Sequence, residues 1–225
     1  MSFRFLLHTL FAVTLTASLV CSVLISAGHA DVPVADTAET IQPLSAGEPA
    51  PRFVLESADG TSFDFNPAEL ERPALLLVFR GGWCPYCNVY LSDMRHVIPE
   101  IRQQGIDVLF LSGDRAELLY SSLEADTQSD IEGLGYTLLS DADAQAAMAL
   151  GIAFKASDRT INRRDEKGDD IDGSSMRRHG VLPVPAVFAV DRDGVIRFAY
   201  TNADYSVRLP ADELLAVAKE IAATD

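Results

Sequence analysis

The chain has 225 residues, a length typical of one domain, and 48% of them are hydrophobic, as in packed globular proteins. Its formal net charge is −15. So acidic a chain repels nucleic acid and anionic lipid, and we expect no nucleic-acid partner.

The first thirty residues are predicted to be a secretion signal rather than part of the fold. Arg4 opens the segment, small and apolar residues run from Phe5 to Ala27, and Gly28-His29-Ala30 supplies the small residues that a signal peptidase reads. We therefore expect a signal over 1–30, cleaved after Ala30, and a periplasmic or secreted protein. An uncleaved membrane anchor is the alternative, because the apolar stretch is long enough to span a bilayer.

Residues 31–46 are polar and rich in Ala and Thr, which predicts a flexible linker before a domain over 47–225. The domain is expected to open with an N-terminal β-hairpin. Its two strands, near 53–55 and 62–65, flank Asp59-Gly60, a dipeptide typical of tight hairpin turns.

An unbroken apolar run from Ala74 to Phe79 predicts a strand buried on both faces, as in a parallel sheet. Beyond Cys87 the apolar residues recur at helical spacing, and the helix is expected to bend or end at Pro99. Cys84 and Cys87 therefore lie where a strand passes into a helix. Free N–H groups and the helix dipole stabilise a thiolate at Cys84, and the thiolate is the nucleophilic form. Cys87 lies one helical turn further, within disulfide reach.

The remaining elements complete an α/β pattern with a mixed central sheet and helices on both faces. They are expected as a strand over 106–111, a helix over about 116–124, a strand over 136–139, a helix over 142–150, strands over 187–190 and 195–200 around the turn Asp191-Arg192-Asp193-Gly194, and a helix over about 211–222. Residues 155–180 interrupt the pattern and predict a long surface loop or insertion. The acidic residues there do not match the spacing of a calcium loop, so we expect no metal.

Several motifs together resemble a known family. Trp83-Cys84-Pro85-Tyr86-Cys87 at the strand–helix junction, with Val184-Pro185-Ala186 before a strand, resembles the thioredoxin fold and its cis-proline loop. The stretch from Arg80 to Asn88, with Leu182-Pro183-Val184-Pro185-Ala186 and the turn at 191–194, resembles the peroxiredoxin-like branch of the alkyl hydroperoxide reductase/thiol-specific antioxidant family. The likeness covers about residues 44–222.

The resemblance implies a thioredoxin fold and a thiol-based antioxidant oxidoreductase. It implies that Cys84 attacks the substrate, that Cys87 resolves the product, and that their redox-active disulfide serves in place of a cofactor. Arg80 is the candidate for polarising a peroxide. A thioredoxin-like dithiol protein is the expected reductant. The expected substrate-binding residues are Trp83, Pro85, Tyr86, Val184 and Pro185.

The sequence also departs from typical peroxiredoxins, which leaves the substrate open. Leu77 and Gly81 stand where those proteins have Pro and Thr, and Pro185 stands where they have Arg, so the usual peroxide cradle is missing. A Cys-Pro-Tyr-Cys motif, with a cis Pro185 that leaves the Val184 backbone open to a substrate strand, suits protein disulfides instead.

We therefore expect a peroxide reductase, with a protein-disulfide oxidoreductase as the alternative. A third hypothesis is a Cu(I) or zinc carrier that binds through Cys84, Cys87 and a His. His179 is a further candidate neighbour of Cys84, as a Cys–His hydrolase would require. A purely structural disulfide is the simplest non-catalytic interpretation, but a bridge across so small a loop stabilises little by chain entropy.

Overall fold

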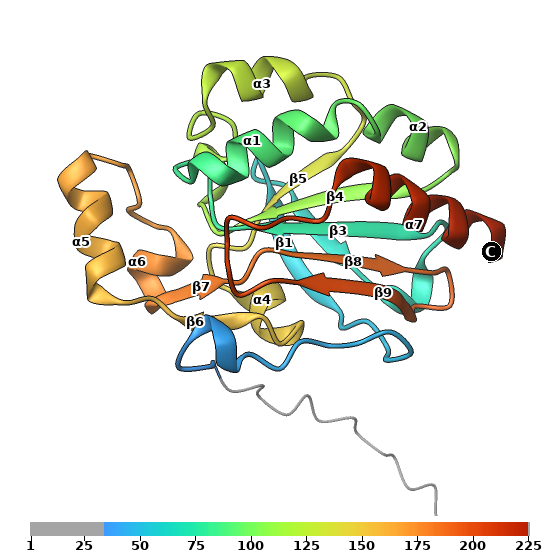
Figure 1. The fold of residues 1–225 in the computed structure, drawn as a ribbon, viewed down its shortest axis with the longest axis horizontal. Helices are drawn as coiled ribbons and strands as arrows, with labels where there is room; N and C mark the ends of the chain where they lie inside the picture. Colours follow the sequence, from blue (N-terminus) through green and yellow to red (C-terminus); the bar gives the residue numbers. More distant parts are fainter. Residues whose placement is uncertain (1–33, 225) are drawn as a thin grey trace, which may run out of the picture. The chain divides into compact units, whose positions relative to one another are not determined.

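A seven-stranded mixed sheet lies at the centre of residues 34–224, the part of the chain that this computed structural model describes (Figure 1). The predicted signal over 1–30 lies outside the described residues. The strands are β1 (Phe53–Ser57), β2 (Ser62–Phe65), β3 (Ala74–Phe79), β4 (Asp107–Ser112), β5 (Thr137–Ser140), β6 (Ala153–Lys155), β7 (Val181–Pro183), β8 (Ala186–Val190) and β9 (Ile196–Thr201). The sheet has the order β2-β1-β5-β4-β3-β8-β9, and β6 pairs with β7 in a separate ribbon.

The middle of the sheet is parallel and its edges are antiparallel. β3, β4 and β5 run parallel to one another, whereas β8 runs antiparallel to β3. All six residues of β3 are buried, as its unbroken apolar run predicts. The predicted hairpins around Asp59-Gly60 and 191–194 form as β1–β2 and β8–β9, and the predicted mixed α/β sheet is confirmed.

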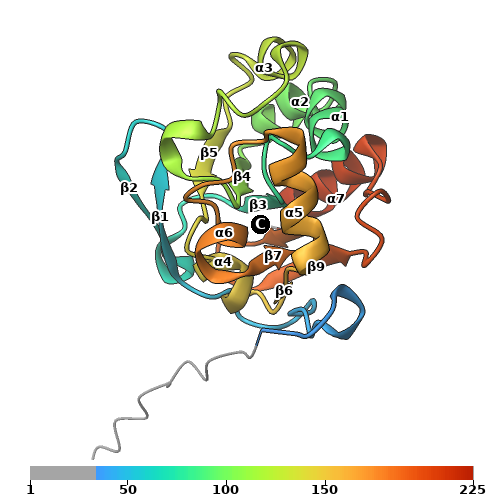
Figure 2. The ribbon, with the colours of Figure 1, turned by 90° about the vertical axis from the view of Figure 1, so that its left-hand side faces the viewer.

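Helices cover both faces of the sheet, as predicted (Figures 1 and 2). They are η1 (Ala38–Thr40), η2 (Pro67–Glu69), α1 (Pro85–Met94), α2 (Ile98–Gln103), η3 (Ala116–Leu118), α3 (Ala125–Ile131), α4 (Gln145–Ala149), α5 (Asp158–Lys167), α6 (Ser175–His179) and α7 (Ala211–Thr224). Side chains of α1, α2, α3 and α7 form one apolar core with the sheet, and α4 contributes to the core on the other face. Within residues 34–224, no helix combines the length and apolar character needed to cross a bilayer.

The predicted linker over 31–46 is wrong for its described part, which packs on the domain. Ala35 exchanges backbone hydrogen bonds with β6, and the Leu44 N–H donates to the Leu150 carbonyl oxygen at 3.1 Å. The half-buried side chains of Val34, Ala38, Ile41 and Leu44 contact the core beside α4. These few apolar side chains are spaced too irregularly to indicate an element, but they suffice to fix the segment on the domain.

One loop prediction and two helix predictions also need correction. Residues 155–180 are not a loop, because they form α5 and α6. Both helices have serine N-caps, and left-handed Gly168 and Gly180 end them. Only 116–118 is helical within 116–124, and the longer helix α3 follows it. The cysteine helix ends at Met94, before Pro99, which lies in the first turn of α2, where its missing N–H is tolerated.

The packed N-terminal segment yields a stability prediction. Replacing Ile41 and Leu44 with serine removes two half-buried apolar side chains from the core beside α4. We expect the free energy of unfolding, measured by urea titration, to fall by roughly 2 kcal/mol. Gln42→Ser, at the exposed position between them, is the control and should change it little. Equal stability of all three proteins would restore the linker interpretation.

Candidate active site

The two cysteines lie where the central strand β3 gives way to α1. Cys84 is the N-cap residue of α1, and Pro85 occupies the first helical position. The Cys84 carbonyl oxygen accepts the N–H of Cys87 at 2.9 Å and the N–H of Asn88 at 3.2 Å, so the helix starts from Cys84 itself. The sulfur of Cys84 therefore lies at the positive end of the helix dipole.

Neither cysteine is in a disulfide, and their environments shift the pKa values of the two thiols in opposite directions. A hydrogen bond from the Cys87 side chain lowers the pKa of Cys84 from 9.0 to about 7, although burial opposes this. The Cys87 backbone N–H and the charges of Arg80 and Arg208 lower that pKa further. Burial, followed by the hydrogen bond to Cys84, raises the pKa of Cys87 well above its ordinary value. At neutral pH the pair thus offers a substantial thiolate population at Cys84 beside a protonated thiol at Cys87.

Two arginines lie beside this pair. Arg80, which follows β3, is 8% exposed, and its guanidinium carbon lies 4.3 Å from the Tyr205 ring centroid and 5.4 Å from that of Phe154. Its Nε has no hydrogen-bond partner within the described residues. An Nη of Arg208 lies 3.8 Å from the Cys87 sulfur. The expectation that Arg80 lies near Cys84 agrees with this geometry, whereas sequence reasoning missed Arg208.

A buried polar network holds the loop that carries Cys84, and sequence reasoning missed it too. One carboxylate oxygen of Asp114 accepts the Gly82 N–H at 2.7 Å and the Ser122 hydroxyl at 2.9 Å. The Asn88 side-chain amide donates to the Gly82 carbonyl oxygen at 2.6 Å. Gly81 has a φ of +148°, and a Cβ there would lie 2.6 Å from the Asp114 carboxylate.

A signal for Asp114 was available in the sequence. Asp114 follows the buried strand β4, which lies parallel to β3, so the ends of the two strands meet. Polar residues at adjacent carboxyl ends of parallel strands commonly build sites. That rule brings Asp114 close to the loop after β3.

A cavity of about 290 Å³ opens beside Cys84, and we call it the Cys84 pocket. Three of the predicted substrate-binding residues, Trp83, Pro85 and Tyr86, line it. Its full lining is Arg80, Trp83, Cys84, Pro85, Tyr86, Thr160, Arg163, Arg164, Lys167 and Tyr205. The Cys84 side chain, 2% exposed, is reached through this pocket.

Val184 and Pro185 do not line the Cys84 pocket, and the predicted cis-proline is wrong. No cis peptide bond occurs within residues 34–224. The Val184 N–H donates to the Ile152 carbonyl oxygen at 2.9 Å, and both Val184 and Pro185 are buried. The backbone of Val184 is therefore already paired inside the domain. The side chain of His179 lies 3.0 Å from Asp143 instead of lining the Cys84 pocket.

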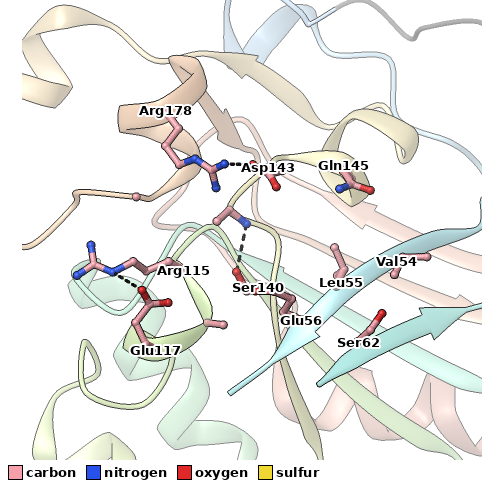
Figure 3. Close-up of a pocket in the computed structure, with 13 residues that line it drawn as sticks. Val54, Leu55, Glu56, Ser62, Arg115, Glu117, Ser140, Asp143, Gln145 and Arg178 are labelled. Carbon is pink, nitrogen blue, oxygen red and sulfur yellow. Dashed lines mark hydrogen bonds and ion pairs between the residues drawn. The ribbon is translucent and has the colours of Figure 1, made fainter. Parts of the chain in front are cut away.

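A larger cavity, of about 520 Å³, holds no cysteine (Figure 3). Its arginines are neutralised by acids, since Arg115 pairs with Glu117 at 3.2 Å and Arg178 with Asp143 at 2.7 Å. In the described part of the chain, no group of three His, Cys, Asp or Glu side chains is arranged to hold a metal ion. The thiol chemistry is therefore concentrated at the Cys84 pocket.

Comparison with known proteins gives matches to thiol-dependent enzymes. The model of the AhpC/TSA family matches residues 46–199. Peroxiredoxin Bcp of Escherichia coli is 32% identical over 112 residues, which cover 50% of this chain and 67% of that protein. The thiol-disulfide oxidoreductase ResA of Halalkalibacterium halodurans is 29% identical over 121 residues, 54% of this chain and 65% of its own length.

Solved structures of similar fold include peroxiredoxins. A yeast mitochondrial 1-Cys peroxiredoxin superposes with a TM-score of 0.62 at 18% identity, covering 81% of this chain and 78% of that one. Peroxidoxin BcpB of Mycobacterium tuberculosis superposes with a TM-score of 0.54 at 18% identity, and the match covers 79% of this chain and 98% of that one. At this identity the likeness bears on the fold alone, and it confirms the predicted thioredoxin fold.

The separated pKa values predict unequal reactivity of the two thiols. Because only the thiolate is alkylated, the rate at Cys84 should rise with pH through about 7 and level off above it. Cys87 should stay protonated and slow throughout this range. Mass spectrometry after timed iodoacetamide pulses measures both rates, and slow, equal labelling at pH 7 would contradict an activated Cys84.

The hydrogen bond from Cys87 gives a second prediction. Cys87→Ala removes the largest contribution that lowers the pKa of Cys84, so that pKa should rise. The alkylation rate at pH 7 should then fall roughly tenfold. Cys87→Ser keeps a hydroxyl donor and is the matched control. Its alkylation rate at pH 7 should fall less than that of Cys87→Ala. If both variants react like the unaltered chain, the hydrogen bond is not what stabilises the thiolate.

Proposed function

The chain belongs to the AhpC/TSA family, and we propose that it reduces hydroperoxides through Cys84, with Cys87 as the resolving cysteine. It matches peroxiredoxins and thiol-disulfide oxidoreductases, and it is a thiol-based oxidoreductase. One observation carries the peroxide proposal. The low-pKa sulfur of Cys84 is reached through a small pocket, beside a buried guanidinium whose Nε is unpaired within the described residues.

Arg80 supplies the electrostatic part of the proposal. As O–O cleavage proceeds, negative charge accumulates on the departing oxygen, and a fixed cation in a buried site stabilises that charge without reorganising. The aromatic rings of Phe154 and Tyr205 hold the guanidinium, so it needs no acidic partner that would neutralise it. Arg80 thereby compensates for the missing Pro, Thr and Arg of the usual peroxide cradle.

The proposed cycle oxidises Cys84, joins it to Cys87 in a disulfide and returns both to thiols. The Cys84 thiolate attacks the terminal oxygen of ROOH, the O–O bond breaks, and RO⁻ takes up a proton and leaves as ROH. Cys84 is then a sulfenic acid. The Cys87 thiol attacks its sulfur, water leaves, and a Cys84–Cys87 disulfide forms. A dithiol reduces this disulfide to two thiols and is itself oxidised to a disulfide.

The reductant and the compartment belong to the same proposal. We expect a thioredoxin-like protein as the dithiol donor, and a periplasmic or secreted location given the character of residues 1–30. The donor's thiol has to reach Cys84 through the Cys84 pocket. Pro85 and the half-exposed Tyr86 form the outer edge of that pocket.

Exchange with protein disulfides is the second candidate, favoured by the ResA match and by two cysteines on one helical turn. The paired backbone of Val184 argues against it, because an incoming substrate strand finds no free N–H there. A small oxidant needs no such docking edge. The peroxide proposal therefore ranks first.

Assays run side by side on one preparation separate these candidates. With dithiothreitol present, we expect the chain to consume hydrogen peroxide, and Cys84→Ser to consume none. In the absence of a thiol, Cys87→Ser should still be oxidised once, and it should pass to sulfinic acid sooner because the sulfenic acid is not resolved internally. Reduction of insulin without peroxide consumption would favour the second candidate. Retention of one Cu(I) or zinc ion per reduced chain, without redox activity, would favour a metal carrier.

The role of Arg80 gives a separate prediction. Arg80→Gln should lower kcat/KM for hydrogen peroxide by roughly 10²-fold, the usual cost of losing one preorganised group at a developing anion. The variant also loses a charge that lowers the pKa of Cys84, so its pH profile should shift upward. Rates compared at pH 9, where both proteins carry a thiolate, isolate the first effect. A deficit that disappears at pH 9 would restrict Arg80 to stabilising the thiolate.

A further inference from the structure

One wall of the Cys84 pocket is formed by residues of the helix α5. This helix belongs to the segment 155–180 that interrupts the α/β pattern, and Figure 2 shows it beside α6. Four residues of α5 line the pocket: Thr160, Arg163, Arg164 and Lys167. Positions three, four and seven apart share one face of a helix. The segment therefore presents a single polar, cationic face to the reactive sulfur.

Of the three α5 cations that line the pocket, one is held in place and two are available. Arg164 pairs with Asp169 at 3.1 Å, donates to the Trp83 carbonyl oxygen at 3.3 Å and lies over the Trp83 ring. It anchors α5 to the loop that carries Cys84. Arg163 and Lys167 are exposed, and neither makes an ion pair with a described residue.

The arginines that line the larger cavity differ from those of the Cys84 pocket in their acidic partners. In the larger cavity, Arg115 and Arg178 each pair with an acid that also lines the cavity (Figure 3). Among the described residues that line the Cys84 pocket, by contrast, there are four cations and no acid. In a chain of net charge −15, such an excess is not expected from composition.

A second observation points to a ligand in this pocket. The Arg80 side chain is buried, and its Nε is unpaired within the described residues although Arg80 lines the pocket. The rings of Trp83, Tyr86 and Tyr205 add aromatic surface to the lining of the same pocket. The pocket thus matches a small molecule with a short carbon chain, a reactive group at Cys84 and an anionic end at α5.

We propose that Arg163 and Lys167 form a carboxylate-binding wall of the Cys84 pocket and select small anionic reactants. The inference rests on the proposed function and narrows its reactant class. Two sources share this chemistry: a carboxylated hydroperoxide that oxidises Cys84, or a carboxylated thiol that reduces the Cys84–Cys87 disulfide.

Alkylation of Cys84 tests the wall without relying on turnover. Iodoacetate and iodoacetamide are of similar size, but only iodoacetate carries a carboxylate. In the Arg163→Glu, Lys167→Glu double variant we expect the ratio of their rates at Cys84 to fall roughly tenfold relative to the unaltered chain. The fall should shrink in high salt, because both side chains are exposed.

Arg159→Glu is the matched control. It lies on α5, is exposed and reverses one charge where the double variant reverses two, but it does not line the Cys84 pocket. Its rate ratio should stay close to that of the unaltered chain. A ratio that is unchanged in the double variant would overturn the proposal. So would an equal fall in Arg159→Glu, which would point to the net field of the helix instead of a local wall.

The two half-reactions identify the reactant. In the oxidative arm, kcat/KM is compared for a carboxylated alkyl hydroperoxide and its methyl ester. In the reductive arm, 3-mercaptopropionate and 2-mercaptoethanol are compared on the disulfide form. In one of the two arms, the double variant should lose the preference for the carboxylated reactant over the neutral one. That arm shows whether the anionic reactant is the hydroperoxide or the thiol. Loss in neither arm, despite a changed alkylation ratio, would refute selection of reactants.

The outcomes also separate this inference from the proposed function. A chain that consumes no hydroperoxide, but whose alkylation ratio and reductive arm respond to the double variant, retains the wall and loses the peroxidase activity. A chain that consumes hydroperoxide with an unchanged alkylation ratio retains the activity and loses the wall.

Discussion

The chemistry of the site depends on two buried thiols one helical turn apart, of which Cys87 lowers the pKa of Cys84. Both thiols are buried, at 2% and 0% exposure, and burial alone disfavours a thiolate at either. The donor from Cys87 reverses that effect at Cys84, while the same burial keeps Cys87 protonated. One helical turn of separation sets this arrangement, so a single local geometry yields a nucleophile and a proton-bearing partner.

The sheet fixes where that turn begins. β3 and β4 run parallel, so the loop carrying Cys84 meets the end of β4, where the Asp114 carboxylate holds the Gly82 N–H. Arg80 leaves β3 just before that loop and is held by two aromatic rings instead of a carboxylate. An arginine held in this way keeps its charge available, which an ion pair would not allow.

The proteins that this chain matches include a peroxiredoxin and a thiol-disulfide oxidoreductase, so the junction of strand and helix does not by itself select a substrate. In our proposal, the substrate is selected by the residues that surround this junction. Here the pairing of Val184 with Ile152 occupies a backbone edge, and α5 closes one side of the pocket with cations. The selectivity that we propose therefore rests on the segment 155–180 more than on the cysteine motif.

Local periodicity and turn chemistry predicted the mixed α/β sheet, the buried strand β3, both hairpins and the position of the cysteines at a helix start. The thioredoxin fold was predicted from the resemblance of the motif around Cys84 and Cys87 to a known family. Trp83, Pro85 and Tyr86 line the Cys84 pocket because they adjoin Cys84 in the chain. Contacts between residues far apart in the chain became known from the three-dimensional structure. It places Arg208 at Cys87, Asp114 at Gly82 and α5 over the pocket, pairs the Val184 backbone, and docks residues 34–46 on the core. Such contacts join residues far apart in the chain, so local patterns do not encode them. Asp114 is the exception, because it follows a strand that is parallel to β3.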